Sequence, residues 1–240
     1  MPPSALYPRN RVRHSAEDAR KTLIDAGLDL FGKYSFEGTS TRMLAEHTKV
    51  NLAAIQYYFG GKGGLYLAVA NHIVERVNTS LGPKLAEIRG ILEQGPLTKQ
   101  RTLGLLCELV ELVVTRFVGM PETDKWLGIV VREQLCPTEA FDILFKGFLE
   151  PFYQTLFDLV TRIQGSESDN FKVKIRGFTI MGQVLIFRMS LAAVKQSLNQ
   201  KDYGQKDLDM IRSVILENVL AIFSANRDCR SSNLKNADEG

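Results

Sequence analysis

The residues best suited to bind another molecule lie within residues 41–62, where the chain reads TRMLAEHTKVNLAAIQYYFGGK. Gln56 carries an amide that can pair with the edge of an adenine base. The methyl groups of Leu52, Ala53 and Ala54 can contact the methyl group of a thymine. An amide and small apolar side chains on one short helix are typical of a helix that reads the major groove of DNA.

A candidate phosphate site follows this run without a gap. Gly60 and Gly61 precede Lys62, and the apolar segment that starts near Leu65 predicts another helix. The first amide groups of a helix have no partner within it, so a helix start that carries a lysine attracts an anion. Beside a helix in the groove, that anion would be a DNA phosphate. The predicted DNA-binding residues are Thr39, Thr41, Arg42, Asn51, Leu52, Ala53, Ala54, Gln56, Tyr57, Tyr58 and Lys62.

Two short helices must cross closely to present these side chains. Leu44 and Ala45 would face inward from the first helix, and Ala45 is small enough for a close crossing. Val50 and Ile55 would close the turn and the second helix over them. The spacing therefore predicts a helix-turn-helix over residues 41–59, followed by a linking helix over residues 63–81.

Residues 43–65 resemble the DNA-binding domain of the TetR-type (TetR/AcrR) transcriptional regulators. The run NLAAI at 51–55, with Arg132-Glu133 and Pro137-Thr138, is similar to the CecR (YbiH)-like branch. The resemblance implies a ligand-responsive regulator, in most cases a repressor, that binds double-stranded DNA at a palindromic operator as a homodimer. It also implies release by a small apolar or aromatic effector, and no cofactor. The matching residues are Thr39, Thr41, Leu44, Ala45, Val50, Ile55, Tyr58, Phe59, Lys62 and Leu65.

The sequence departs from that pattern at two places. Lys49 stands in the turn where the family usually has glycine, and a left-handed backbone there costs roughly 1 kcal/mol. Gly63 and Gly64 follow Lys62 where the family usually has an acidic residue, and each costs about 0.5–1 kcal/mol of helix stability relative to alanine. We expect the turn to form and the start of the next helix to fray until DNA orders it.

Charge is concentrated on the segment with the DNA-binding pattern. Residues 1–70 hold nine Lys or Arg and six Asp or Glu, whereas the other 170 residues hold 21 of each. This is the distribution expected for a phosphate-binding domain, although ordinary scatter would also produce it. The amino terminus lacks the apolar segment of a signal peptide, and no apolar run is long enough to span a membrane. We expect a cytoplasmic protein with no membrane partner.

The residues that could bind metal or act in catalysis are scattered. Cys107, Cys136 and Cys229 are widely spaced, which favours reduced thiols; the first two are expected in the core, with redox sensing as the alternative. The three histidines lack ligand-spaced neighbours, so no metal site is predicted. No nucleophile, P-loop or dinucleotide-binding motif occurs, so no catalytic residue is predicted.

The apolar pattern predicts an all-α protein, because strand-like alternation is not sustained anywhere. We expect a basic arm at 1–14, a first helix opened by a capping box at Ser15 and Asp18, and a three-helix DNA-binding domain over 15–75. A helical effector-binding and dimerisation domain would cover 76–226, and a disordered tail 227–240. Gly82-Pro83 should end the linking helix, and Pro151 should kink or break another.

Two regions of the second domain are candidates for a small-molecule pocket and a dimer interface. Aromatic residues between Trp126 and Phe157 form either plain core or a small-molecule pocket. The helix over 170–198 has two apolar faces, which fits either a dimer interface shared with the last helix or a central helix of a monomer. The predicted pocket residues are Trp126, Arg132, Phe141, Phe145, Phe148, Phe152 and Gln183. The predicted interface residues are Phe187, Leu191, Val194, Ile211, Ile215, Val219 and Ile222.

Two other classes of function stay open on sequence grounds. One is a helical enzyme with a site in the aromatic region. The other is a helical adaptor that uses its helix-turn-helix for protein contacts, because Leu52, Ala53 and Ala54 are unusually apolar for a groove-facing turn. A gel shift with the DNA upstream of the protein's own gene separates these classes from a DNA-binding regulator.

Overall fold

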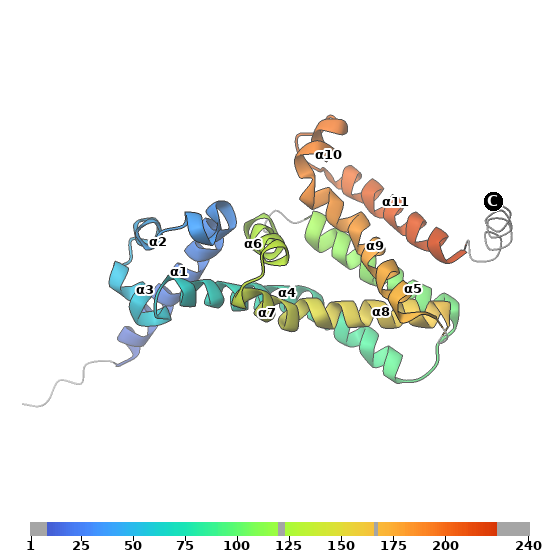
Figure 1. Cartoon of the computed structure of the whole chain (residues 1–240), viewed down its shortest axis with the longest axis horizontal. Helices are drawn as coiled ribbons and strands as arrows, with labels where there is room; N and C mark the ends of the chain where they lie inside the picture. The colour runs from blue at the N-terminus through green and yellow to red at the C-terminus, as the bar shows by residue number, and fades with distance from the viewer. Residues whose placement is uncertain (1–8, 120–122, 166–167, 225–240) are drawn as a thin grey trace, which may run out of the picture. The chain divides into compact units, whose positions relative to one another are not determined.

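The computed structural model describes residues 9–119, 123–165 and 168–224, with side chains described from Ala16 onward except at positions 123 and 124. Every regular element within these ranges is helical, as predicted (Figure 1). The elements are α1 Arg9–Gly38, α2 Thr41–Thr48, α3 Leu52–Phe59, α4 Lys62–Glu93, α5 Lys99–Val113, η1 Val114–Val118, α6 Thr123–Leu135, α7 Glu139–Leu144, η2 Phe145–Leu149, α8 Glu150–Gln164, α9 Asn170–Met189, α10 Leu191–Ser197 and α11 Gln205–Ser224. The labels η1 and η2 denote π-helical turns.

The helices form two compact units. Unit 1 consists of Met1–Val77 and Asp124–Phe148, and unit 2 of Asn78–Thr123 and Leu149–Gly240. The change at Val77 lies close to the boundary expected at residue 75. The second segment of unit 1 differs from expectation, because α6 and α7 pack with the N-terminal helices rather than with the rest of the second domain.

Unit 1 is built around the apolar faces of α1 to α4. Leu23 and Phe31 of α1, Leu44 of α2, Ile55 of α3 and Leu65 of α4 are all fully buried. These five side chains come from four helices, so they join the helix-turn-helix to the helices on either side of it. Burying a leucine of this kind is worth about 2–5 kcal/mol against alanine, which outweighs local costs in the turn.

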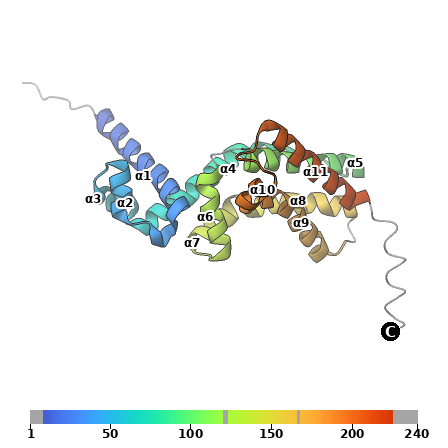
Figure 2. The same cartoon turned by 90° about the horizontal axis from the view of Figure 1, so that it is seen from above.

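Helix α6 approaches α1 very closely within unit 1. A Cβ atom built on Gly32 would lie 2.1 Å from the carbonyl oxygen of Lys125, and one on Gly128 would lie 2.9 Å from the carbonyl oxygen of Gly32. Only glycine permits this approach at these positions. Both views show α6 beside the C-terminal end of α1 (Figures 1 and 2).

Unit 2 contains α5, α8, α9 and α11, with η1 continuing α5. Helix α8 packs against α5 and α9, and α11 packs against α5. Gly177 allows the close contact of α9 with α8, since a Cβ there would lie 2.6 Å from the ring of Phe157. Its core includes the aliphatic side chains of Leu109, Leu156 and Ile180, which are fully buried.

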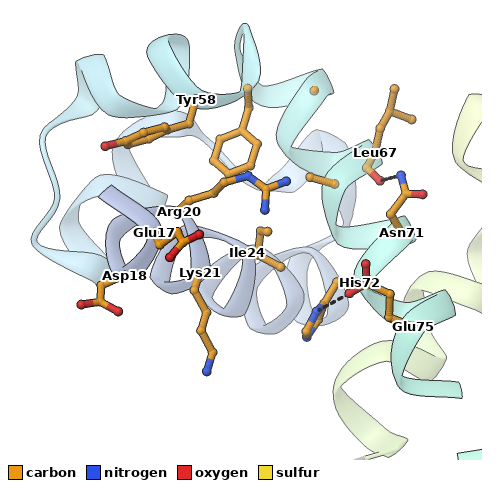
Figure 3. Close-up of a pocket in the computed structure, with 13 residues that line it drawn as sticks. Glu17, Asp18, Arg20, Lys21, Ile24, Tyr58, Leu67, Asn71, His72 and Glu75 are labelled. Atoms are coloured by element: carbon orange, nitrogen blue, oxygen red, sulfur yellow. Dashed lines mark hydrogen bonds and ion pairs between the residues drawn. The ribbon is translucent and has the colours of Figure 1, made fainter. Parts of the chain in front are cut away.

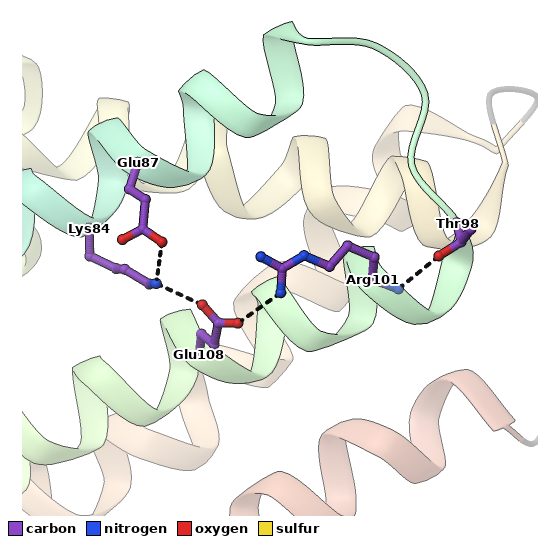
Figure 4. Close-up of polar contacts among 5 residues, drawn as sticks. All are labelled: Lys84, Glu87, Thr98, Arg101 and Glu108. Carbon is purple, nitrogen blue, oxygen red and sulfur yellow. Dashed lines mark hydrogen bonds and ion pairs between the residues drawn. The ribbon is translucent and has the colours of Figure 1, made fainter.

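Charged side chains join the C-terminal half of α4 to α5 within unit 2. The Lys84 Nζ lies 2.7 Å from Glu108 Oε2 and 2.8 Å from Glu87 Oε1, and Arg101 Nη1 lies 3.2 Å from Glu108 Oε1 (Figure 4). Hydrogen bonding to Lys84 is the main reason that the pKa of Glu108 is lowered. These side chains are partly exposed, so each pair contributes little to stability.

The observed boundaries of α1, α4 and α8 can be compared with the boundaries predicted from the sequence. Helix α1 begins at Arg9, so Ser15 lies inside it rather than at its start. Helix α4 continues through Pro83 to Glu93, and the prediction that it ends at Gly82-Pro83 was wrong. The buried Leu81 and Leu85 hold the helix on both sides of this proline. A kink or break was expected at Pro151, but the chain stays helical here: it passes from the π-helical turn of η2 into α8, and this residue lies in the first turn of α8.

No single helix of the described residues has the length and hydropathy needed to cross a membrane. One bent pair of helices, α9 with α10, passes the same test by length and composition, with a bend of 78° between the two helices. Of the predicted arm at 1–14, residues 1–8 lie outside the described residues, whereas residues 9–14 are helical and begin α1, so the arm was predicted too long. The predicted tail at 227–240 also lies outside the described residues.

Candidate nucleic-acid interface

Helix α2 begins at a serine cap and holds the turn of the helix-turn-helix in place. The Ser40 side chain accepts a hydrogen bond from the Met43 amide at 3.1 Å, which satisfies one of the free amides of the first turn. Thr41 is the first helical residue and is half-buried. Arg42 is exposed and pairs with Glu46 at 2.8 Å, so its guanidinium is held on the outer face of α2.

The turn between α2 and α3 adopts the predicted left-handed conformation. Lys49 has φ 56° and ψ 21°, which confirms that a residue with a side chain occupies the position favoured by glycine. Asn51 then caps α3, accepting a hydrogen bond from the Ala53 amide at 2.9 Å through Oδ1. Its carboxamide oxygen therefore fixes the start of α3, which leaves Nδ2 as the group that can reach another molecule.

Helix α3 presents one exposed face. Tyr57 is 82% exposed and Leu52 is 51% exposed, and Ala53 and Gln56 are exposed as well. Ile55 is buried beneath them, which fixes the rotation of the helix. Ala54 and Tyr58 are half-buried at the edges of this face, and the Tyr58 ring packs edge-on against Tyr57 at 5.0 Å. The predicted outward residues of α3 thus lie together on the surface.

The start of α4 is tightly packed rather than frayed. Gly60 and Gly61 have φ of 71° and 122°, which only glycine adopts readily, and they turn the chain sharply from α3 into α4. A Cβ atom on Gly64 would lie 1.8 Å from the carbonyl oxygen of Phe59. Glycine is therefore required for α4 to begin directly against the end of α3. The expectation that this helix start frays considered only the low helix propensity of glycine and not this packing.

Lys62 is held inside the domain. Its ammonium group donates to the carbonyl oxygens of Phe36 at 2.9 Å and Thr39 at 3.1 Å, and it lies 4.2 Å from the centre of the Phe36 ring. An ammonium group has three N–H donors, so one remains for a phosphate. The sequence predicted only the phosphate contact and missed this internal role, in which Lys62 ties the start of α4 to the α1–α2 connection.

Thr39 is fully buried, so the prediction that its side chain contacts DNA is wrong for this structure. Its hydroxyl donates to the carbonyl oxygens of Leu30 at 3.1 Å and Ser35 at 2.7 Å. Ser35 is also the residue at which α1 is kinked, with φ 68° and ψ 175°. The neighbouring Ser40 caps α2. The sequence does not indicate which of the three consecutive hydroxyl residues at 39–41 forms this cap.

Arg132 also belongs to the α1 kink rather than to an effector pocket. Its Nη2 donates to the carbonyl oxygens of Phe31 and Gly32, the second at 2.7 Å. A cation at the C-terminal end of a helical segment is favoured both by these free carbonyls and by the helix dipole. The prediction that Arg132 lines the effector pocket is therefore corrected: it is a helix-capping residue of unit 1.

The other predicted pocket residues are divided between the units. Trp126, Phe141, Phe145 and Phe148 lie in unit 1, while Phe152 and Gln183 lie in unit 2. Trp126, Phe148 and Phe152 are buried, whereas Phe145 is partly exposed and stacks on Phe141 at 5.6 Å. Inside unit 2 the rings of Tyr153, Phe157 and Phe178 form a separate cluster with centroids 4.9–5.7 Å apart.

A groove of about 930 Å³ lies along α1 and α4 of unit 1 (Figure 3). Glu17, Asp18, Arg20 and Lys21 line it from α1, and Arg20 lies over the Phe59 ring at 5.6 Å. Two acidic and two basic side chains of α1 line the groove, so it does not attract an anion as a whole. It is also distinct from the predicted aromatic pocket, because all of its lining residues lie between positions 17 and 75.

The predicted dimer residues do not share one surface. Ile211, Ile215 and Val219 are buried in the core of unit 2, so their assignment to an interface was wrong. Phe187, Leu191, Val194 and Ile222 are half-buried. A different set of apolar side chains on α9 is exposed, at spacings of three, four or eight residues; we call it the α9 stripe, and it consists of Phe171, Ile175, Phe178, Ile186 and Met189.

The cysteines and histidines form no metal site among the described residues. Cys107 is half-buried in α5, and burial raises the pKa of its thiol. Cys136 is exposed at the corner between α6 and α7, so its predicted place in the core was wrong. Cys229 lies outside the described residues.

Comparison with known proteins agrees with this arrangement. Residues 23–69 match the family described as bacterial regulatory proteins, tetR family, and residues 104–225 match the C-terminal domain of the HTH-type transcriptional dual regulator CecR. The chain is 25% identical to the dual regulator CecR of Shigella flexneri over 83% of this chain and 88% of that protein. It is 36% identical to the regulator RutR of Escherichia coli K12 over 31% of this chain and 35% of RutR.

Solved structures show the same fold. The hemolysin II regulator HlyIIR superposes with a TM-score of 0.57 at 18% identity, over 83% of this chain and 97% of HlyIIR. AibR, solved in complex with isovaleryl coenzyme A and operator DNA, superposes with a TM-score of 0.61 at 11% identity over the same shares. This family consists of regulators and not enzymes, which excludes the enzyme alternative. The chain belongs to the TetR family of DNA-binding transcriptional regulators and, within it, to the CecR-like branch.

Proposed function

We propose that this regulator binds a palindromic operator as a homodimer, represses transcription there, and is released by a small apolar or aromatic effector. The observation that carries the proposal is the exposed face of α3 placed directly before the start of α4. Leu52, Ala53, Gln56 and Tyr57 are accessible on this face, and Ile55 beneath them is buried. A helix of eight residues with this face can enter the major groove.

The start of α4 supports the phosphate contact in this proposal. The first amides of α4 have no partner within the helix, and the third hydrogen of the Lys62 ammonium group is free to join them. Tyr58 lies at the edge of the α3 face next to this helix start. Arg42 on the outer face of α2 adds a further cation near the groove-reading helix.

The α9 stripe supports a homodimer. Phe171 is 72% exposed, and Ile175, Phe178, Ile186 and Met189 are each about half-exposed. Contiguous apolar side chains of this size are rarely left in water on a single soluble chain, so they mark a covered surface. A second copy of the same chain is the occupant we propose, because a twofold pair of α3 helices is what a palindromic site requires. Met210, Val214 and Leu220 of α11 are also exposed and extend the apolar area.

Two features of unit 2 support the proposal that it binds an effector. Oε1 of Gln183 on α9 is buried and accepts no hydrogen bond from the described residues, so a ligand with a donor group would satisfy it. The Tyr153, Phe157 and Phe178 rings on α8 and α9 supply apolar surface of the kind that lines ligand pockets. An amphipathic compound with an aromatic or aliphatic part and one hydrogen-bond donor fits both features.

A titration of the DNA upstream of the protein's own gene tests the proposal. The unaltered protein should shift a palindromic fragment at low concentration and a shuffled fragment only at much higher concentration. An effector found by thermal shift must weaken operator binding by the same factor by which operator DNA weakens effector binding. Equal affinity for the palindromic and shuffled fragments would reject the operator, and a compound that binds without changing DNA affinity would reject the switch.

A further inference from the structure

A buried polar cluster joins the corner between α6 and α7 to the DNA-binding helices, and no part of the proposed function uses it. Its central group is the carboxylate of Glu133 on α6, which is 3% exposed. Tyr66 of α4 donates its hydroxyl to Glu133 Oε1 at 2.7 Å. From the other side, the Thr138 amide donates to Oε2 at 2.9 Å and the Thr138 hydroxyl donates to the same oxygen at 2.9 Å.

The neighbouring residue extends the cluster to α1. Arg132 donates to the carbonyl oxygens of Phe31 and Gly32, in the last turn of α1 before its kink at Ser35. Two consecutive residues of α6 thus hold two different DNA-binding helices, Arg132 holding α1 and Glu133 holding α4. The short glycine contact between Gly32 and Gly128 places α6 where both bonds can form.

The Tyr66 ring reaches the same part of the domain as Lys62. It lies edge-on to Phe31 at 5.0 Å and 5.1 Å from Phe36, whose carbonyl accepts from Lys62. Burial, with the hydrogen bond to Glu133, raises the pKa of the Tyr66 hydroxyl, so it remains a proton donor at all ordinary pH values. Tyr66 is one turn after Lys62 on α4, and whatever fixes Tyr66 also fixes the helix start that we assign to phosphate.

We infer that Glu133, Tyr66 and Arg132 are positioning residues for DNA binding, which hold the first turn of α4 and the kink of α1 in the orientation that presents α3. The inference rests on the proposed function. A buried carboxylate that accepts several hydrogen bonds has a well-defined geometry, because loss of any one bond leaves a buried polar group without its partner. Movement of the α6–α7 corner therefore changes the positions of α4 and α1 through these bonds.

The test compares Tyr66→Phe, Glu133→Gln and the double variant with the unaltered protein in binding to the upstream DNA fragment. Each single variant should bind about tenfold more weakly at a temperature where it is fully folded, as charge-assisted hydrogen bonds of this kind would give. The two substitutions together should weaken binding by less than the product of the single effects, because Tyr66 and Glu133 share one hydrogen bond. Glu133→Gln removes a negative charge, which by itself would strengthen DNA binding, so a loss of affinity is not a charge effect.

The matched control is Lys125→Met. Lys125 also joins α6 to α1, through an ion pair with Asp29 at 3.0 Å, but this pair is exposed. The DNA affinity of Lys125→Met should lie within twofold of that of the unaltered protein, because exposed ion pairs contribute little. Gly32→Ala gives an independent perturbation without touching a polar side chain, since its methyl group would meet the Lys125 carbonyl and push α6 from α1. It should weaken DNA binding as the Glu133 variant does.

Amide hydrogen exchange supplies a readout that does not depend on the operator. Exchange at residues 62–67 and at 31–35 should be faster in Tyr66→Phe than in the unaltered protein, while exchange in α3 stays the same. A fall in thermal stability with unchanged exchange and unchanged DNA affinity would overturn the inference, because the cluster would then only stabilise the fold. If the unaltered protein does not bind the fragment, the proposed operator fails, and the exchange result alone decides the inference.

Discussion

Helices α3 and α9 both expose large apolar side chains, yet the two surfaces differ in what accompanies them. On α3, Leu52 and Tyr57 stand among Gln56 and the capped amides at the start of the helix. On α9, Phe171, Ile175 and Phe178 follow one another at helical spacing, and the accessible polar residues lie between and beside them. A base edge requires hydrogen-bonding groups at fixed positions, whereas a second copy of the chain requires only apolar area that matches itself. We therefore propose that the same exposure marks two different partners.

The comparison is tested most severely by placing a charge in the α9 stripe. Ile175→Glu should give a monomer whose operator affinity falls by more than a hundredfold, because an unpaired carboxylate buried in an apolar interface is very costly. Sedimentation and DNA titration measure the two effects. Lys174→Glu, one residue away and off the stripe, should remain a dimer; a dimer formed by Ile175→Glu would place the interface elsewhere.

The proposal that the α3 surface reads bases through hydrogen bonds depends on Gln56. Gln56→Ala should cost about 1–3 kcal/mol at one base pair of the operator and little at the others, because it removes a contact to one base edge. Binding to a panel of single-base operator variants measures this. A loss that is equal for every sequence in the panel would show that Gln56 does not read a base.

Lys62 should act on all DNA sequences alike. Lys62→Met should weaken binding uniformly and lower the salt dependence by about one phosphate contact. It should also lower the thermal stability, because the carbonyls of Phe36 and Thr39 lose their donor. Lys33→Met, an exposed lysine of α1 that lies over the Tyr34 ring, is the control. An unchanged salt slope with reduced stability would assign Lys62 to the internal role alone.

The turn that presents α3 is predicted to carry strain. Lys49→Gly should stabilise the protein by up to about 1 kcal/mol, because the left-handed backbone at φ 56° suits glycine. Urea unfolding measures the change, and the operator affinity should stay as it is because the Lys49 side chain is exposed beside the turn. Weaker DNA binding would instead assign its ammonium group to a phosphate.

The smallest expected effect concerns the ion pairs between α4 and α5. Lys84→Met should cost between 0.2 and about 1 kcal/mol at neutral pH, since the pairs are partly exposed. Lys84 lowers the pKa of Glu108 in the folded protein, so its contribution is complete above the ordinary carboxyl pKa of 4.5 and is lost as the pH falls further. Below pH 4.5 the free energy of unfolding of Lys84→Met should therefore depend less on pH than that of the unaltered protein. An unchanged profile would mean that the pair contributes nothing.

The sequence predicts the helix-turn-helix well because its signals are local. Leu44 and Ile55 alternate with exposed residues at helical spacing, and Gly60 and Gly61 mark the sharp turn into α4. The burial of Thr39 and the capping by Ser40 were not predicted, because three consecutive hydroxyl residues carry the same local signal. The internal bonds of Lys62 depend on the kink in α1, which no residue pattern near Lys62 reveals.

The second half of the chain was harder to predict because its apolar pattern has more than one solution. Helix α11 carries apolar residues on two faces. Its packing against α5, η1 and α9 shows that Ile211 and Ile215 are core while Met210 and Val214 are exposed. Arg132 was assigned to a pocket on its charge alone. Its true partners, the carbonyls of Phe31 and Gly32, are a hundred residues away in sequence.

The exposed α9 stripe has a consequence for how the regulator responds to its own abundance. If the stripe is covered by a second copy, the fraction of paired chains depends on mass action, and a dilute sample unfolds at a lower temperature than a concentrated one. Well below the dissociation constant of the pair, the amount of paired protein rises with the square of the chain concentration. A modest change in expression would then alter operator occupancy steeply, without any effector.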